Sequence, residues 1–191
     1  MANYKDCPHF NIHNDYYTPK SAWEAIKPFI DKKGYKKVFE CFLLNSNEQS
    51  KEYLNELGYD TLGTKDTDFL DNTTWSGDMI MKNYDIIVSN PPFERIKSYK
   101  ERKSNLKYKC IEKLFELDKP FIILMNSSNM FQLWFKELAE RKDLKFIFPA
   151  KKIQFYKYKE GGVDILEPGK GGASFNSIYV CYKVLDKNEW I

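Results

Sequence analysis

The sequence lacks a long apolar run and lacks paired cysteines, and these two absences narrow the class of protein. No stretch approaches the roughly 18 consecutive apolar residues that span a bilayer, and the first twenty residues hold no apolar segment typical of a signal peptide. The four cysteines (Cys7, Cys41, Cys110 and Cys181) form no CxxC pair and no Cys/His cluster, which argues against a zinc site and a disulfide scaffold. We expect a soluble, intracellular or cytoplasmic protein in a reducing compartment, not a secreted one.

Apolar and aromatic residues are plentiful enough for a folded core. The 191-residue chain is 42% hydrophobic and 16% aromatic, which is typical of a globular protein and not of a disordered chain. This length suits one compact unit, so we expect a single domain over residues 1–191.

Positive charge is scarce in the first half of the chain and abundant in the second. Residues 1–90 carry 10 Lys/Arg against 14 Asp/Glu, whereas residues 91–191 carry 20 against 13. This split suggests one half for a small ligand and one face toward a polyanion, although a solvated basic surface would give the same count.

Predicted strands and helices alternate along most of the chain. Helical spacing occurs in 21–31 (where Pro28 interrupts the pattern and Ser21 is a possible N-cap), 47–59, 105–118 and 130–142, and short runs typical of strands occur in 36–42, 60–63, 84–89, 119–126 and 144–149. This order predicts an α/β, Rossmann-like fold with a mostly parallel twisted sheet. Two late strands, 151–159 and 175–185, are predicted to pair through a glycine-rich loop as a C-terminal antiparallel hairpin at the sheet edge.

The stretch "DIIVSNPPF" (85–93) ends a buried strand with two prolines, which is unusual for a core strand. Proline donates no backbone hydrogen bond and restricts its predecessor to extended conformations, so local turns cannot consume all the carbonyl oxygens of this loop. Asn90 adds an amide oxygen and Phe93 a flat apolar face. Rigid acceptors beside an aromatic plane suit an amino group attached to a planar ring.

This "NPPF" resembles the catalytic motif, (Asp/Asn/Ser)-Pro-Pro-(Tyr/Phe/Trp), of the S-adenosylmethionine-dependent amino-methyltransferases, most closely the N6-adenine DNA methyltransferases. The resemblance implies a Rossmann-like methyltransferase fold, S-adenosylmethionine as cofactor, and transfer to adenine N6 in DNA without a metal. It also implies that Asn90 and Pro91 bind the target amine while Phe93 stacks on the base.

Further matches to this family lie on both sides of the motif. The segment "YTP" (Tyr17, Thr18 and Pro19) resembles the part that folds over the methionine end of the cofactor, and Glu40 and Phe42 match the acidic and aromatic positions after the first strand. Asp66 stands near the position that binds the cofactor ribose, and Asp68 with Phe69 resembles the motif that contacts the cofactor adenine. These are the cofactor-binding residues that the resemblance implies.

The loop after the first strand departs from the family. It reads Leu43 to Asn47 ("LLNSN") and contains none of the glycines that bring the backbone close to the cofactor. Asn tolerates left-handed conformations, so the loop can still turn. The alternatives are an RNA adenine methyltransferase, a protein glutamine methyltransferase, or a lapsed methyltransferase that survives as a nucleic-acid-binding subunit.

Two basic clusters are candidate nucleic-acid contacts because they lie next to the motif and next to the glycine-rich loop. They comprise Arg95, Lys97, Lys100, Arg102 and Lys103 in the first cluster, and Lys151, Lys152, Lys157 and Lys170 in the second. A DNA partner is favoured over RNA. Sequence specificity would come from 94–109, from 155–174, or from a partner subunit, since the chain has little room for a separate recognition domain.

Overall fold

A seven-stranded, mostly parallel sheet forms the centre of the computed structural model, which describes residues 16–43, 48–63, 69–70, 83–91, 100, 102–140, 142–159, 162–164 and 175–191. The strand order is β10-β6-β9-β5-β4-β2-β3, and β9 alone runs antiparallel to its neighbours in this sheet. The strands are β2 (Lys37–Phe39), β3 (Asp60–Leu62), β4 (Ile86–Ser89), β5 (Phe121–Asn126), β6 (Leu144–Phe148), β9 (Ser177–Tyr182) and β10 (Glu189–Trp190).

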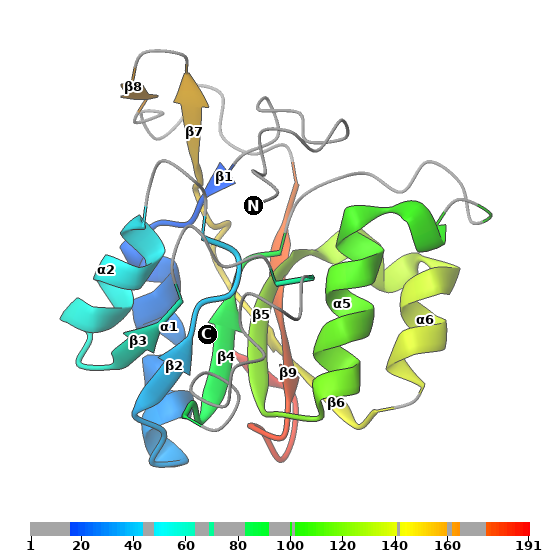
Figure 1. The fold of residues 1–191 in the computed structure, drawn as a ribbon, viewed down its shortest axis with the longest axis horizontal. Coiled ribbons are helices and arrows are strands. Elements are labelled where there is room, and N and C mark those ends of the chain that lie inside the picture. The colour runs from blue at the N-terminus through cyan, green and yellow to red at the C-terminus, as the bar shows by residue number, and fades with distance from the viewer. Residues whose placement is uncertain are drawn as a thin grey trace.

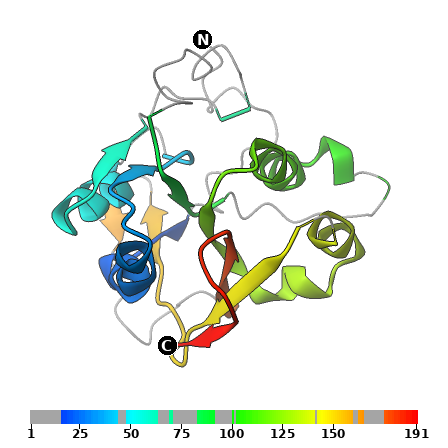
Figure 2. The ribbon, with the colours of Figure 1, turned by 90° about the horizontal axis from the view of Figure 1, so that it is seen from below.

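Helices cover both faces of this sheet (Figures 1 and 2). The first pair, α1 (Lys20–Lys32) and α2 (Gln49–Glu56), packs on one face, and α5 (Leu106–Leu117) with α6 (Leu133–Ala139) packs on the other. Short 3-10 helices precede the second pair, η3 (Arg102–Ser104) before α5 and η4 (Ser127–Phe131) before α6. The predicted α/β Rossmann-like fold is therefore confirmed.

The central strands read as continuous apolar runs because both of their faces are buried. In β4, for example, Ile87 joins the core beneath α5 and α6, whereas Ile86 and Val88 join the core beneath α1 and α2. The same alternation holds in β5, where neighbouring side chains enter opposite cores. Two apolar layers therefore hold the sheet in place.

The parallel strands all end at one edge of the sheet. We name the carboxyl edge as the end of the sheet that follows Phe39, Leu62, Ser89, Asn126 and Phe148, where β2 to β6 terminate. Because these strands are parallel, the residues that follow them meet at one edge, which is where α/β sheets bind ligands.

A second, three-stranded sheet lies beyond the carboxyl edge (Figure 1). In it β7 (Tyr156–Lys159) pairs antiparallel with both β1 (Tyr16–Tyr17) and β8 (Gly162–Asp164). A late antiparallel hairpin is thus present, but β8 from the glycine-rich stretch is the partner of β7. The last long strand, β9, lies between β5 and β6 and is not at the sheet edge, which corrects the predicted pairing.

Helix boundaries differ from the prediction: α2 spans only Gln49–Glu56, and the starts of α1 and α6 are shifted. Helix α1 begins at Lys20 with Pro19 at its N-cap, so Ser21 lies inside the first turn and does not cap the helix. Helix α6 begins at Leu133 because Ser127–Phe131 forms a separate 3-10 helix. The Asn126 side chain caps this 3-10 helix by accepting a hydrogen bond from the Ser128 amide at 2.9 Å. No helix within the described ranges is long and apolar enough to cross a membrane.

Candidate active site

Asn90 and Pro91 follow β4 directly and lie at the carboxyl edge. β4 has β2 on one side and β5 on the other, so the chain leaves the sheet between two buried strands. Asn90 is half-buried and Pro91 is buried. The third predicted catalytic residue, Phe93, lies outside the described residues.

The Asn90 side chain contacts a segment far away in the sequence. Its Nδ2 donates a hydrogen bond to Thr18 Oγ1 at 3.0 Å. Thr18 is 3% exposed and lies between β1 and the first turn of α1. The structure therefore brings together two predicted site segments, the "YTP" segment and the "NPPF" motif.

Glu40 follows β2 and is also connected to the end of β4. Its carboxylate accepts a hydrogen bond from Ser89 Oγ and another from the backbone amide of Phe42 at 3.1 Å. The side chain is 2% exposed, and burial raises its pKa to about 7 although both hydrogen bonds favour the ionised form. Glu40 therefore joins the ends of β2 and β4 beneath the edge, with Ser89 as its partner.

The backbone at the end of β3 lies close to the backbone at the end of β2. Gly63 follows β3 with φ of +114°, and a Cβ atom there would lie 2.2 Å from the carbonyl oxygen of Glu40. The Glu40 amide in turn donates to the carbonyl of Leu62 at 3.0 Å. Glycine at position 63 is thus required for the two strand ends to meet.

Aromatic side chains line the sequence-predicted cofactor segments. Phe42 is partly buried and packs edge-on against Phe69, with ring centroids 5.0 Å apart. Phe69 itself is fully buried in the core, and Tyr17 and Pro19 are buried around Thr18. The cofactor roles of these residues stay predictions, as do those of Asp66 and Asp68, which lie outside the described residues.

The arrangement of strands is shared with a solved structure. A Listeria monocytogenes protein, provisionally described as a class I S-adenosylmethionine-dependent methyltransferase, matches with a TM-score of 0.51 and 12% sequence identity over 99% of this chain and 69% of that chain. The chain has the fold of the class I methyltransferases. No protein-family model and no curated protein sequence matches it. At this identity the likeness concerns the methyltransferase fold alone, so the activity has to be argued from the residues of the site.

The predicted basic residues that the structure describes lie on the same side of the methyltransferase fold. Lys151 and Lys152 are exposed just after β6, and Lys100 and Lys103 are exposed shortly before the start of α5. Lys157 belongs to β7 and Arg102 to η3. Arg95, Lys97 and Lys170 lie outside the described residues, so their predicted nucleic-acid contacts stay predictions.

Sequence reasoning missed three features of this edge. Ser89 ends the predicted strand 84–89, and a hydroxyl that closes a buried apolar run is a signal for a polar partner. Gly63 carried the signal of an isolated glycine directly after a strand. Phe131, in η4 after β5, is 87% exposed, and Leu133 nearby is 56% exposed. Their exposure has no sequence signal, because similar residues in the same segment are buried.

Proposed function

We propose that this protein transfers a methyl group from S-adenosylmethionine to the N6 amino group of adenine in nucleic acid, with DNA as the preferred substrate. One observation carries the proposal. Asn90 and Pro91 follow β4, an interior strand of a class I methyltransferase fold, at the carboxyl edge, where α/β folds bind their ligands.

The chemistry of this loop suits an amino group on a planar ring. The nitrogen of such a group is a poor nucleophile because its lone pair is delocalised into the ring. The Asn90 amide oxygen and the Pro91 carbonyl are neutral acceptors, and hydrogen bonds from both amine hydrogens favour the tetrahedral nitrogen that develops as it reacts. A proline at 92 has no backbone N–H, so it cannot itself donate a hydrogen bond to these acceptors.

The described residues fit a cofactor at the carboxyl edge through the ends of β2 and β3 and the segments next to them. Gly63 lies against the Glu40 carbonyl so closely that no side chain fits, which brings the backbone ends of β2 and β3 together at this edge. Tyr17, Thr18 and Phe42 would hold the cofactor from the neighbouring segments. When bound there, S-adenosylmethionine supplies an electrophilic methyl group. Glu40 is buried beneath this edge and shapes it through Ser89 and Phe42.

Charge and exposed aromatic surface support a nucleic-acid substrate over a protein amide. Exposed Lys103, Lys151 and Lys152 lie toward the carboxyl edge and are suited to phosphate groups. Phe131 presents most of its ring to solvent after β5, the strand next to β4, and an unstacked base gains on the order of 1–3 kcal/mol from such an aromatic face.

Calorimetry with S-adenosylmethionine tests the cofactor assignment. We expect micromolar binding, and the product of the reaction, S-adenosylhomocysteine, should compete for the site. Absence of binding at millimolar ligand would contradict the proposal and would favour the lapsed, nucleic-acid-binding alternative that the glycine-free loop at 43–47 suggests.

A substrate panel tests the acceptor. Wild-type protein is incubated with methyl-labelled cofactor and duplex DNA, single-stranded DNA, structured RNA or a glutamine-containing protein extract. The proposal expects label in DNA as N6-methyladenine. Label confined to RNA or to protein would move the assignment to the corresponding alternative substrate.

A further inference from the structure

The hydrogen bond between Asn90 and Thr18 links the amine-binding loop to a segment 72 residues earlier. The donor is Asn90 Nδ2 and the acceptor is Thr18 Oγ1, at 3.0 Å. The amide oxygen on the same planar group is the atom proposed to receive the target amine. Whatever holds the nitrogen of this amide therefore also sets the direction of its oxygen.

Thr18 is well placed to hold the amide because its own position is fixed from both sides. On one side, Tyr17 is paired with Tyr156 in the β1–β7 ladder. On the other, the Pro19 carbonyl accepts from the Ala22 amide at 3.0 Å in the first turn of α1. Both neighbours of Thr18 are buried, as is Thr18 itself. Its hydroxyl is thus attached to two regular elements and not to a loose loop.

The backbone of Asn90 is held independently of its side chain. Ser89, the preceding residue, donates its hydroxyl hydrogen to the Glu40 carboxylate below the edge. That contact anchors the end of β4 to the end of β2, but it leaves the terminal torsion of the Asn90 side chain undetermined. Such a torsion between sp³ and sp² atoms has a broad energy profile, so a specific contact is needed to fix the amide plane.

We propose that Thr18 is a positioning residue for Asn90: the buried hydroxyl fixes the plane of the Asn90 amide so that its oxygen is preset to accept the target amine. This role rests on the proposed function and differs from the cofactor contact that the "YTP" resemblance implies for Thr18. Presetting the acceptor removes the need to reorient it as the amine reacts, which is the source of electrostatic preorganisation.

Two matched substitutions at position 18 separate the positioning role from the cofactor contact by their effects on kcat and on cofactor binding. Thr18→Val keeps the shape and removes the hydroxyl, whereas Thr18→Ser keeps the hydroxyl. We expect kcat to fall about tenfold or more in Thr18→Val, with the Kd for S-adenosylmethionine changed less than about twofold, and Thr18→Ser to recover most of kcat. An unchanged kcat in Thr18→Val, or weaker cofactor binding with kcat retained at saturating cofactor, would overturn the positioning role.

A spectroscopic readout tests the contact without turnover. The Asn90 side-chain NH₂ resonance is assigned by its loss in Asn90→Asp and is followed in ¹⁵N-labelled protein. We expect it to shift and to exchange faster with solvent in Thr18→Val but not in Thr18→Ser. If Thr18→Val fails to fold by circular dichroism, Thr18→Ala serves in its place.

The two readouts distinguish the possible failures. If the wild-type protein is active but the Asn90 resonance does not change in Thr18→Val, the positioning role alone is overturned. A wild-type protein that binds cofactor but methylates no nucleic acid overturns the proposed function, and the positioning role with it, even if the resonance reports the contact.

Discussion

At the scale of single residues, Glu40 has a hydrogen-bond partner that the sequence alone does not reveal. The family resemblance implies that this acid binds cofactor, and that role stays a prediction. In the structure the Glu40 carboxylate is buried and accepts from Ser89 and from the Phe42 amide. The sequence cannot reveal this partner, because Ser89 lies 49 residues away. Only the pairing of β2 with β4 brings the two strand ends together.

The raised pKa of Glu40 predicts a pH-dependent stability. Between pH 4.5, the ordinary value, and about 7, the folded protein keeps a proton that the unfolded chain has released. The free energy of unfolding therefore falls as pH rises through this window, by an amount on the order of 3 kcal/mol. Glu40→Gln, which stays neutral and still offers an oxygen acceptor, should remove this fall. Urea denaturation at pH 5 and pH 8 measures it.

An exposed glutamate provides the control for this prediction. Glu116→Gln on α5 changes the same chemical group outside the site and should retain the wild-type slope of stability against pH. A Glu40→Gln variant with the same slope as wild type would contradict the assignment of the buried, protonated carboxyl group.

At the scale of elements, the long periodic segments were predictable and the short connections were not. Helix α1, helix α5 and strand β5 lie close to their predicted ranges because apolar spacing over a dozen residues, or a continuous apolar run, reports burial directly. Strands β1 and β10 have two residues each, too few for any periodicity. The strand order could not be predicted from the sequence either, since β9 reaches its interior position through pairing with β5 and β6.

The close contact between the backbones at the ends of β2 and β3 predicts how two glycine substitutions affect stability. Gly63→Ala places a Cβ atom against the Glu40 carbonyl, whereas Gly58→Ala has nothing within 4 Å and suffers only from its positive φ of +96°. We expect Gly58→Ala to cost about 1–2 kcal/mol of unfolding free energy and Gly63→Ala to cost clearly more, with weakened cofactor binding. Equal losses in the two variants, measured by chemical denaturation, would contradict the close approach described for Gly63.

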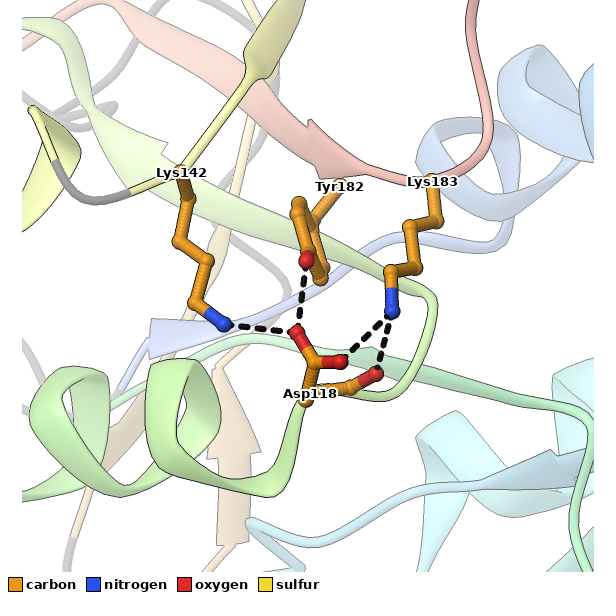
Figure 3. Close-up of polar contacts among 4 residues, drawn as sticks. All are labelled: Asp118, Lys142, Tyr182 and Lys183. Atoms are coloured by element: carbon orange, nitrogen blue, oxygen red, sulfur yellow. Dashed lines mark hydrogen bonds and ion pairs between the residues drawn. The ribbon is translucent and has the colours of Figure 1, made fainter.

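At the opposite edge of the sheet, Asp118 ties α5 to the strands behind it (Figure 3). It ends α5 in the left-handed conformation, with φ of 53°. Its carboxylate accepts from Lys142 at 2.6 Å, from Tyr182 at 2.6 Å and from Lys183 at 2.7 Å. The hydrogen bonds from Lys142, Lys183 and Tyr182 lower the pKa of this carboxyl group. The cluster is structural, since it lies at the amino ends of β5 and β6.

Asp118→Asn tests this interpretation because asparagine also tolerates the left-handed conformation but carries no charge. We expect a modest drop in melting temperature at pH 7. The difference from wild type should shrink as pH falls below 3.8, since a depressed carboxyl pKa stabilises the fold only while the group is ionised. Methyl transfer should be unaffected, and a loss of activity without unfolding would place the cluster in the site instead.

At the scale of the whole molecule, exposed lysines occur at both edges of the sheet, and Lys151 and Lys152 are among those near the edge that carries Asn90. If Lys151 and Lys152 contact phosphates, replacing both by Ala should reduce the slope of log K against log salt for DNA binding by about 2, roughly one per lysine. The matched control replaces Lys32 and Lys187, which are exposed at the end of α1 and in the segment before β10. Fluorescence anisotropy across a salt series measures both, and equal slopes in the two variants would contradict a nucleic-acid interface at the carboxyl edge.

The central claim is that Asn90 activates the amino group of adenine at this edge. The most direct measurement is the amount of N6-methyladenine formed in DNA incubated with S-adenosylmethionine and either wild-type protein or Asn90→Ala, quantified by mass spectrometry of the nucleosides. We predict product with the wild type and a loss on the order of 10²-fold or more in Asn90→Ala, with the circular dichroism spectrum and cofactor binding preserved. Equal product from the two proteins, or none from the wild type, would contradict the claim.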